Sequence, residues 1–271
     1  MKGSLFMIKN LNGKFVKHIS LSEEVDHAIK NGEPIVALES AVISHGLPFP
    51  KNFQVALQLE KIVRGYGITP ATIGVINGLV RIGLKEDEIR ILSKGNNLLK
   101  ISCRNLGIAI AKGLSGGTTV AGTITIAKIA GIKVFATGGI GGIHRNTPFD
   151  ISADLNTMAN TPIIIVCAGA KAILDLPATI ERLETYSIPI IGYKTDEFPA
   201  FYSRESGLAV NIRADSITEI INIANAQWQL GLNSAILVRV PPPKEYAMPF
   251  DVINKAIDKA LINAKKMGIR G

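Results

Sequence analysis

The sequence predicts an α/β protein in which helices cover both faces of a mixed, largely parallel sheet, an α/β/α sandwich. Segments with helical periodicity alternate with short β-branched runs along the chain, as expected of strands joined by helices. The chain has 271 residues and is 47% hydrophobic, so it can bury one sizeable core. Since no internal repeat or low-complexity linker divides it, we expect a single domain over residues 1–271.

Helices are expected where apolar residues recur every three to four positions, as Val55, Leu59 and Ile62 do. Strands are expected where β-branched residues cluster in short runs. The expected helices span residues 22–30, 52–66, 217–230 and 250–267. The expected strands span residues 35–38, 72–76, 133–136, 163–167, 188–193 and 234–240.

The charge balance does not point to nucleic acid as a partner. Lys and Arg number 30 against 22 Asp and Glu, a net charge of +8, but the basic residues are scattered and aromatic residues make up only 6%. An anionic small substrate explains the surplus equally well. The lysines near the C-terminus are expected on a solvated helix face; they are Lys255, Lys259, Lys265 and Lys266.

Neither membrane association nor a disulfide framework is expected. Charge interrupts residues 1–9 too soon for a signal-peptide core, and no apolar run is long enough to span a bilayer. The two cysteines, Cys103 and Cys167, do not form a metal-binding spacing, and Cys167 is expected in the core. The expected location is the cytoplasm.

Lys171 is the first candidate for chemistry, because it closes an uninterrupted apolar run over residues 161–171. The segment from Ala172 to Leu176 is expected to begin a helix. The amine would then stand at the carboxyl end of a buried strand, the edge at which α/β sheets bind ligands. Burial favours the uncharged amine, which can attack a carbonyl carbon, so a Schiff-base lysine is one hypothesis. The alternative is a structural lysine that reaches to solvent.

Asp150 and Asp154 form a second candidate site. If this stretch is the first turn of a helix, the i and i+4 spacing puts both carboxylates on one face. A hard divalent ion held by one carboxylate and several waters would relieve their repulsion. The alternative is an N-cap at Asp150 followed by a solvated Asp154.

A glycine-rich turn over residues 138–142 precedes the two aspartates and follows an expected strand. Its backbone amides can approach an anion closely, and His144 and Arg145 add charge-assisted donors, which suits a phosphate. Tight turns also need glycine, and the spacing differs from the dinucleotide fingerprint.

Glu39 interrupts an otherwise buried strand segment near the N-terminus. Burial raises the pKa of a carboxyl group that has no ion partner, toward the range of a useful general acid. A glutamate at a strand end, paired with a nearby Lys or Arg, is the alternative.

Taken together, these segments resemble the pseudouridine-5'-phosphate glycosidases, also called the indigoidine-A-like family. The matching stretches occur in the same order as in the family and span nearly the whole chain, which makes the resemblance highly specific. The matching stretches are ALES (37–40), HGLP (45–48), TTVA (118–121), FATGGIGGIHR (135–145), FDISAD (149–154), CAGAKAILD (167–175) and GYKTDEFPAF (192–201).

The resemblance implies reversible cleavage of the C–C glycosidic bond of pseudouridine 5'-phosphate to uracil and ribose 5-phosphate. By motif position, Lys171 is implied to trap C1' of the opened ribose as an imine, Glu39 to donate a proton, and Asp154 to assist at the ring oxygen. Asp150 is implied to ligate Mn²⁺, one ion per subunit. The implied substrate contacts are Lys100, Val120, His144, Ser152, Ala153 and Asp154.

The resemblance further implies a homotrimer. Family members usually continue into a further helical segment that contributes an asparagine to the site, whereas this sequence stops at Gly271, and Val240-Pro241 stands where an Asn-Pro pair is more common. Two alternatives stay open: a catalytically impaired member that binds a sugar phosphate, and another imine-forming enzyme acting on a sugar phosphate, such as an aldolase.

Overall fold

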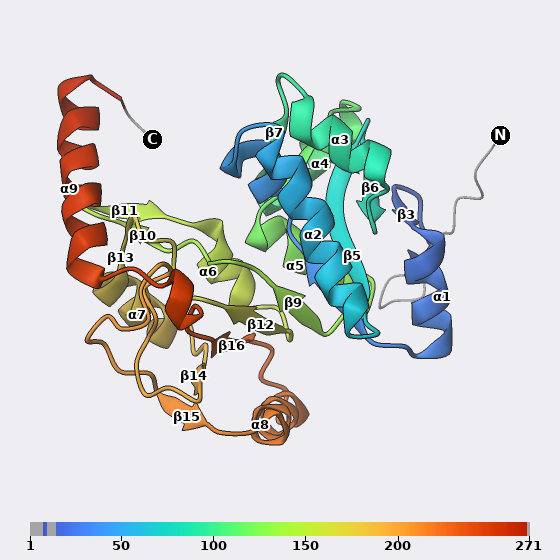
Figure 1. Cartoon of the computed structure of the whole chain (residues 1–271). Helices are drawn as coiled ribbons and strands as arrows, with labels where there is room; N and C mark the ends of the chain where they lie inside the picture. The colour runs from blue at the N-terminus through green and yellow to red at the C-terminus, as the bar shows by residue number, and fades with distance from the viewer. Residues whose placement is uncertain (1–7, 10–14, 270–271) are drawn as a thin grey trace. The chain divides into compact units, whose positions relative to one another are not determined.

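The computed structural model describes residues 8–9 and 15–269 (Figure 1). Most of residues 1–9, on which the expectation of no signal-peptide core rests, and the last two residues of the chain lie outside the described residues. The chain divides into two compact units: an N-terminal unit of residues 1–136 and 161–163, and a C-terminal unit of residues 137–160 and 164–271. The expectation of a single domain over residues 1–271 stays a prediction.

The N-terminal unit contains strands β1 to β9 and helices α1 to α5. Its strands are β1 (Ile8–Lys9), β2 (Phe15–Val16), β3 (Ile19–Leu21), β4 (Ile35–Leu38), β5 (Thr69–Ile76), β6 (Leu79–Ile82), β7 (Leu99–Ile101), β8 (Gly116–Thr118) and β9 (Val134–Ala136). Its helices are α1 (Glu23–Asn31), α2 (Lys51–Gly65), α3 (Glu86–Lys94), α4 (Cys103–Ala111) and α5 (Val120–Ile129), with a π-helical turn η1 (Val42–Gly46).

Strand β5 organises the sheet of this unit, because its two halves pair with different strands. Its first half lies parallel to β4, which is also parallel to β9. Its second half is antiparallel to β6, across a turn at Asn77-Gly78 in which both residues have positive φ, and antiparallel to β8. Strand β7 lies parallel to β8. The carboxyl end of β4 therefore lies next to β8, where the helix α5 begins.

The C-terminal unit contains strands β10 to β16 and helices α6 to α9. Its strands are β10 (Ile143–His144), β11 (Thr147–Ile151), β12 (Ile164–Cys167), β13 (Leu174–Asp175), β14 (Ile190–Tyr193), β15 (Ile212–Ala214) and β16 (Ile236–Arg239). Its helices are α6 (Ala153–Met158), α7 (Leu176–Thr185), α8 (Ile217–Gln229) and α9 (Phe250–Lys266), with a 3₁₀ turn η2 (Lys244–Tyr246).

Within this unit, β15, β14, β16 and β12 follow one another in that order and all pairs are parallel. A second, small antiparallel sheet has the order β11, β10, β13. The apolar face of α8 packs on the parallel strands, since Ile220 and Ala224 cluster with Ile191, Ile236 and Val238. The loop that carries Lys171 follows the carboxyl end of the parallel strand β12.

The sequence located the long amphipathic helices and the buried strands closely. Each expected helix and strand is present with ends that differ by at most three residues, the largest difference being the earlier start of β5 at Thr69. Cys167 is buried, and the four lysines of α9 are exposed, as expected. Among the described residues, no helix combines the length and apolar character needed to cross a bilayer.

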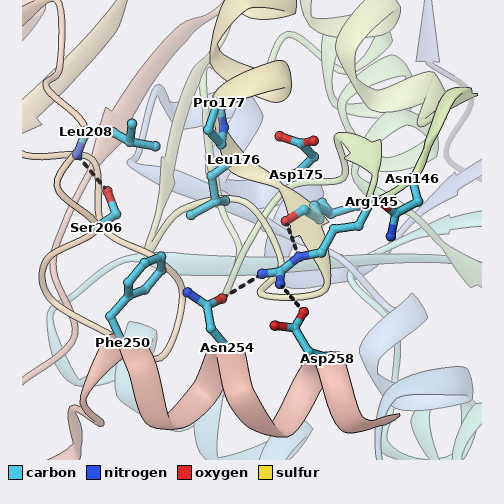
Figure 2. Close-up of a pocket in the computed structure, with 11 residues that line it drawn as sticks. Arg145, Asn146, Asp175, Leu176, Pro177, Ser206, Leu208, Phe250, Asn254 and Asp258 are labelled. Carbon is cyan, nitrogen blue, oxygen red and sulfur yellow. Dashed lines mark hydrogen bonds and ion pairs between the residues drawn. The ribbon is translucent and has the colours of Figure 1, made fainter. Parts of the chain in front are cut away.

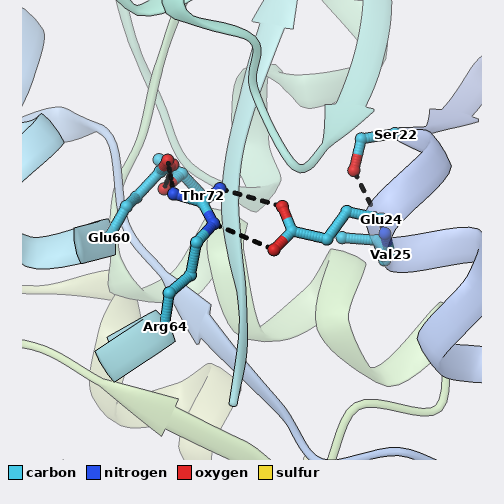
Figure 3. Close-up of polar contacts among 6 residues, drawn as sticks. All are labelled: Ser22, Glu24, Val25, Glu60, Arg64 and Thr72. Carbon is cyan, nitrogen blue, oxygen red and sulfur yellow. Dashed lines mark hydrogen bonds and ion pairs between the residues drawn. The ribbon is translucent and has the colours of Figure 1, made fainter. Parts of the chain in front are cut away.

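A buried carboxylate joins three elements of the N-terminal unit (Figure 3). Glu60 of α2 is 5% exposed; it accepts a hydrogen bond from the hydroxyl of Thr72 in β5 and another from Nη1 of Arg64. Arg64 in turn donates from Nε and Nη2 to both carboxylate oxygens of Glu24 in α1. Burial raises the pKa of Glu60, although the bonds from Thr72 and Arg64 oppose the shift.

This network predicts a pH-dependent effect of Glu60→Gln. A carboxyl group whose pKa is raised by folding binds more protons in the native state, so its contribution to stability falls as pH rises from about 4 through the folded-state pKa. The wild-type free energy of unfolding, minus that of Glu60→Gln, is therefore expected to decrease over this range in urea titrations. Glu184→Gln, at an exposed position of α7, is the control and should show no trend. An increase of the difference with pH would contradict the assignment.

Candidate active site

Lys171 lies in a loop that follows β12 and runs alongside the glycine turn. The backbone amide of Lys171 donates to the carbonyl of Ile140 over 3.0 Å, the amide of Ile140 donates to Gly169 over 3.1 Å, and the amide of Ala168 donates to Gly138 over 3.2 Å. Lys171 is half-buried. These three hydrogen bonds hold the Lys171 loop against the glycine turn, so Lys171 does not lie on a freely solvated segment.

The expected helix start at Ala172 is wrong. Residues 172–173 form a turn, β13 follows, and α7 begins only at Leu176 with Asp175 as its N-cap. The Asp175 carboxylate accepts the amide of Ala178, which is why the helix starts there. Strand β12 ends at Cys167, so Lys171 comes four residues beyond the end of the strand.

Asp154 is the buried acid of the candidate site. It is 4% exposed and its Oδ2 accepts the backbone amide of Gly141 over 2.8 Å. Ser152 caps α6 by accepting the amide of Asp154, and its own amide donates to the carbonyl of Gly142. The anion bound by the glycine turn within this unit is thus the Asp154 carboxylate, which also lies at a helix N-terminus.

The expectation that Asp150 and Asp154 share one helical face is wrong. Asp150 belongs to β11 and is exposed, whereas Asp154 lies in the first turn of α6, which begins at Ala153. The alternative with Asp150 as N-cap and a solvated Asp154 is also wrong, since the cap is Ser152 and Asp154 is buried. The i and i+4 spacing imitates a helical turn because the end of β11 at Ile151 is followed closely by the start of α6 at Ala153.

The glycines of the turn allow the chain to approach itself closely. A Cβ atom on Gly141 would lie 2.2 Å from the Ser152 hydroxyl oxygen and 2.7 Å from Oδ2 of Asp154. One on Gly142 would lie 2.4 Å from the hydroxyl oxygen of Thr179, which accepts the amide of Ile143. Because these glycines have no side chain, Asp154 and the start of α7 can pack directly against the turn.

His144 and Arg145 differ in their use by the fold. His144 lies in β10, half-buried, with Leu174 of β13 as its antiparallel partner. Arg145, expected as a phosphate donor, directs its guanidinium to two backbone carbonyls and two side chains of its own unit, including Asp258. The expectation for Arg145 is therefore corrected to a structural bridge.

Glu39 follows β4 directly and is half-buried. Its neighbour Ser40 is fully buried; the amide of Ser40 donates to the carbonyl of Thr118, and its hydroxyl accepts the amide of Thr118 and donates to Ile73. Thr118 ends β8 and Val120, also fully buried, begins α5. The structure thus fixes the segments that carry Glu39 and Val120 side by side.

Lys100 joins the same part of the N-terminal unit. It lies in β7, where its register partner in β8 is Gly117. A Cβ atom on Gly117 would lie only 2.5 Å from the carbonyl oxygen of Ser40. Strand β8 is therefore in close contact with the segment that follows β4, and it lies between that segment and β7. Lys100 is exposed. The N-terminal unit contains Glu39, Lys100 and Val120, and the C-terminal unit contains Lys171, His144, Asp150 and residues 152–154.

Among the described residues, no group of three or more His, Cys, Asp or Glu side chains is placed to hold a metal ion. Asp150 is exposed and offers hard carboxylate oxygens, the donor type that Mg²⁺ and Mn²⁺ accept. The residues present fit an ion held by one carboxylate together with waters or substrate oxygens, and they do not fit a dedicated protein cage.

Arg239 is a notable residue that the sequence analysis did not single out. It ends β16 and is fully buried; its Nη1 contacts the Cys167 sulfur at 3.1 Å and its guanidinium lies over the Phe198 ring at 3.9 Å. Nε and Nη2 have no hydrogen-bond partner within the described part of the chain. The available signal is an arginine that closes an apolar strand run, the same kind of signal that singles out Lys171.

Comparison with known proteins identifies relatives over most of the chain. The family model described as indigoidine synthase A like protein matches residues 24–271. A pseudouridine-5'-phosphate glycosidase of Caldanaerobacter subterraneus is 51% identical over 257 residues, covering 94% of this chain and 84% of that protein. The Escherichia coli K12 protein of the same name is 50% identical over 256 residues, covering 93% of this chain and 82% of that protein.

Two solved structures share the fold. The prealnumycin C-glycosynthase AlnA, in complex with ribulose 5-phosphate, superposes with a TM-score of 0.86 at 39% identity, covering 94% of this chain and 84% of AlnA. An indigoidine synthase A-like protein of Thermotoga maritima superposes with a TM-score of 0.82 at 34% identity. The match covers 89% of this chain and 80% of that protein. The predicted fold class, a mixed and mostly parallel sheet with helices on both sides, is confirmed.

Proposed function

The chain belongs to the indigoidine synthase A like family, and we propose that it cleaves the C–C glycosidic bond of pseudouridine 5'-phosphate to uracil and ribose 5-phosphate, reversibly. The observation that carries the proposal is the loop of Lys171, hydrogen-bonded to a glycine turn that also holds the buried Asp154 carboxylate. The relatives that share half of its residues carry the name of this activity, and AlnA binds a pentose phosphate.

The chemistry requires a nucleophile because a carbon leaving group offers no oxygen or nitrogen to protonate, so a pair of carboxylates alone does not suffice. In the proposal, the Lys171 amine bonds to C1' as the C1'–O4' bond of the ribose breaks, and Asp154 transfers a proton from the attacking amine to the ring oxygen. An acid then protonates C5 of the base. The C1'–C5 bond breaks with its electron pair left on uracil, and the nitrogen lone pair forms the iminium. Water hydrolyses the iminium, which releases ribose 5-phosphate and restores the amine.

Glu39 is proposed as the acid that protonates C5 of the base. Glu39→Gln keeps the shape of the side chain but removes its proton, so we expect kcat for uracil release to fall by about 10²–10⁴-fold. Steady-state assays over pH measure this change, with Glu33→Gln, an exposed position before β4, as the control. Near wild-type turnover of Glu39→Gln would exclude Glu39 as the proton donor.

The remaining proposed contacts orient the substrate. Lys100 and His144 would bind the phosphate, and Ser152, Ala153 and Val120 would line the sugar and base. Because remote binding energy positions the reacting atoms, pseudouridine without its phosphate should show lower kcat as well as weaker binding.

Mn²⁺ is proposed as the metal, ligated by Asp150. When bound, it would supply a positive charge beside the substrate oxygens. Asp150→Asn is expected to raise the Mn²⁺ concentration that gives half-maximal activity by about tenfold or more, because it removes the carboxylate charge. Titration of the metal-stripped protein measures this, with Asp87→Asn, at an exposed position of α3, as the control. An unchanged Mn²⁺ requirement in Asp150→Asn would remove this residue as the ligand.

We also propose that the protein acts as a homotrimer. Its proposed location is the cytoplasm, where a phosphate monoester is retained because its charge opposes transfer through a bilayer. Sedimentation analysis tests the trimer.

The direct test of function is product analysis. Purified protein and Mn²⁺ with pseudouridine 5'-phosphate should yield uracil and ribose 5-phosphate in equal amounts. A carbonyl fragment without free uracil would favour another imine-forming enzyme. Binding of ribose 5-phosphate without turnover would instead identify an impaired family member.

A further inference from the structure

Arg145 connects three segments of the C-terminal unit through one guanidinium group (Figure 2). Its Nε donates to the carbonyl of Leu174 over 3.2 Å and its Nη2 to the carbonyl of Ala172 over 3.1 Å. Nη2 also donates to Oδ1 of Asn254 over 2.7 Å, and Nη1 to Oδ1 of Asp258 over 3.1 Å. The Arg145 side chain is 20% exposed, so these bonds are partly shielded from solvent.

The two carbonyls belong to the turn that begins at Lys171. The amide of Leu174 donates to the carbonyl of Lys171 over 3.0 Å and closes this turn, and Arg145 holds two carbonyls inside it. On its other side, the amide of Lys171 is bound to Ile140. The backbone of Lys171 is thus fixed from both directions, from the glycine turn before it and from Arg145 after it.

The other half of the guanidinium is held by helix α9. Asn254 and Asp258 are i and i+4 on one face of that helix, so both side chains reach the same group. Asp258 supplies the negative charge that compensates Arg145. An arginine suits this place because its planar fork can serve carbonyls and a carboxylate at once, whereas lysine offers donors from a single point.

We infer that Arg145, held by Asn254 and Asp258, is a positioning residue that sets the reach of the Lys171 amine toward C1' of the substrate. This inference rests on the proposed function. The carbonyls of Ala172 and Leu174, once released, would let the turn relax and move Lys171 away from its attacking position. Helix α9 thereby contributes to the reaction through its hydrogen bonds to Arg145.

The test is the rate at which the lysine imine forms, followed by borohydride trapping of ribose 5-phosphate at short times. Arg145→Ala should lower this rate by about 10–100-fold, since a displacement of about 1 Å from the reactive geometry costs up to that much. Noncovalent affinity for ribose 5-phosphate, measured by calorimetry in a Lys171→Met background, should change by less than about threefold. Arg145→Lys should recover only part of the rate. Arg213→Ala, which removes an exposed ion-paired arginine of the same unit, should leave it unchanged.

Asn254→Ala combined with Asp258→Ala keeps the test decisive if Arg145→Ala fails to fold, because Asp258 is 62% exposed and its loss leaves the core intact. This double variant should slow trapping in the same direction as Arg145→Ala. Trapping at the wild-type rate in the folded variants would overturn the inference, as would an equal loss of noncovalent affinity. If the wild-type protein itself traps no ribose 5-phosphate, the proposed function fails instead.

Discussion

Lys171→Met is expected to lower kcat for pseudouridine 5'-phosphate cleavage by more than about 10³-fold, because no other group replaces the amine that bonds to C1'. Methionine fills much of the space of the lysine stem, and the bond from the Lys171 amide to Ile140 is made by the backbone, so the loop should keep its course. Substrate binding should survive better than turnover. Quantification of released uracil measures the first effect and calorimetry with ribose 5-phosphate the second.

Lys259→Met is the control for this substitution. Lys259 is exposed on α9, and its replacement removes one positive charge of the same kind. Its turnover should match the wild type. If Lys171→Met retained a tenth or more of the wild-type rate, the covalent mechanism would have to be abandoned even if the products were those proposed.

Arg239→Met is expected to raise the free energy of unfolding by about 1–3 kcal/mol, because the variant no longer leaves hydrogen-bond donors buried without an acceptor. Arg239 is fully buried, burial lowers its pKa, and within the described part of the chain its Nε and Nη2 have no acceptor. The contact of the guanidinium with the Phe198 ring offsets only about 0.5–2 kcal/mol of the cost of burying the charge. Urea titration at neutral pH measures the change.

Arg239→Lys distinguishes charge from packing at this position. It keeps a buried positive charge, so it should bring no gain in stability. A loss of more than about 1 kcal/mol in Arg239→Met would show that the guanidinium has a compensating partner, and the expected sign would then be wrong. Since unsatisfied buried groups persist where function requires them, the activity of the stabilised variant shows whether the reaction uses Arg239.

Periodicity was sufficient for the elements whose hydrophobic pattern is long. The helix α2 and the helix α9 begin and end within a residue of the expected bounds, because their apolar residues repeat at helical spacing over at least four turns. Short elements were harder. The aspartates at 150 and 154 fit a helical turn locally, yet Thr147–Ile151 pairs as a strand with β10, a partner that no local pattern reveals.

The motifs identify the candidate residues, but they do not identify the residues that hold those candidates in place. The sequence pointed to Lys171, Glu39 and the glycine turn, whereas the bonds that hold Lys171 in place come from distant residues. Arg145 reaches Asn254, which lies 109 positions along the chain, and no spacing rule connects two residues so far apart. The same limit applies to the contact between Ser40 and Thr118, 78 positions apart, which fixes the segment after Glu39.

The most direct measurement of the mechanism is mass spectrometry of the protein after incubation with ribose 5-phosphate and borohydride. The covalent mechanism predicts one reduced pentose phosphate adduct per chain, located by peptide mapping on the side chain at position 171. An adduct confined to a different lysine, or no adduct in a preparation that releases uracil, would contradict it.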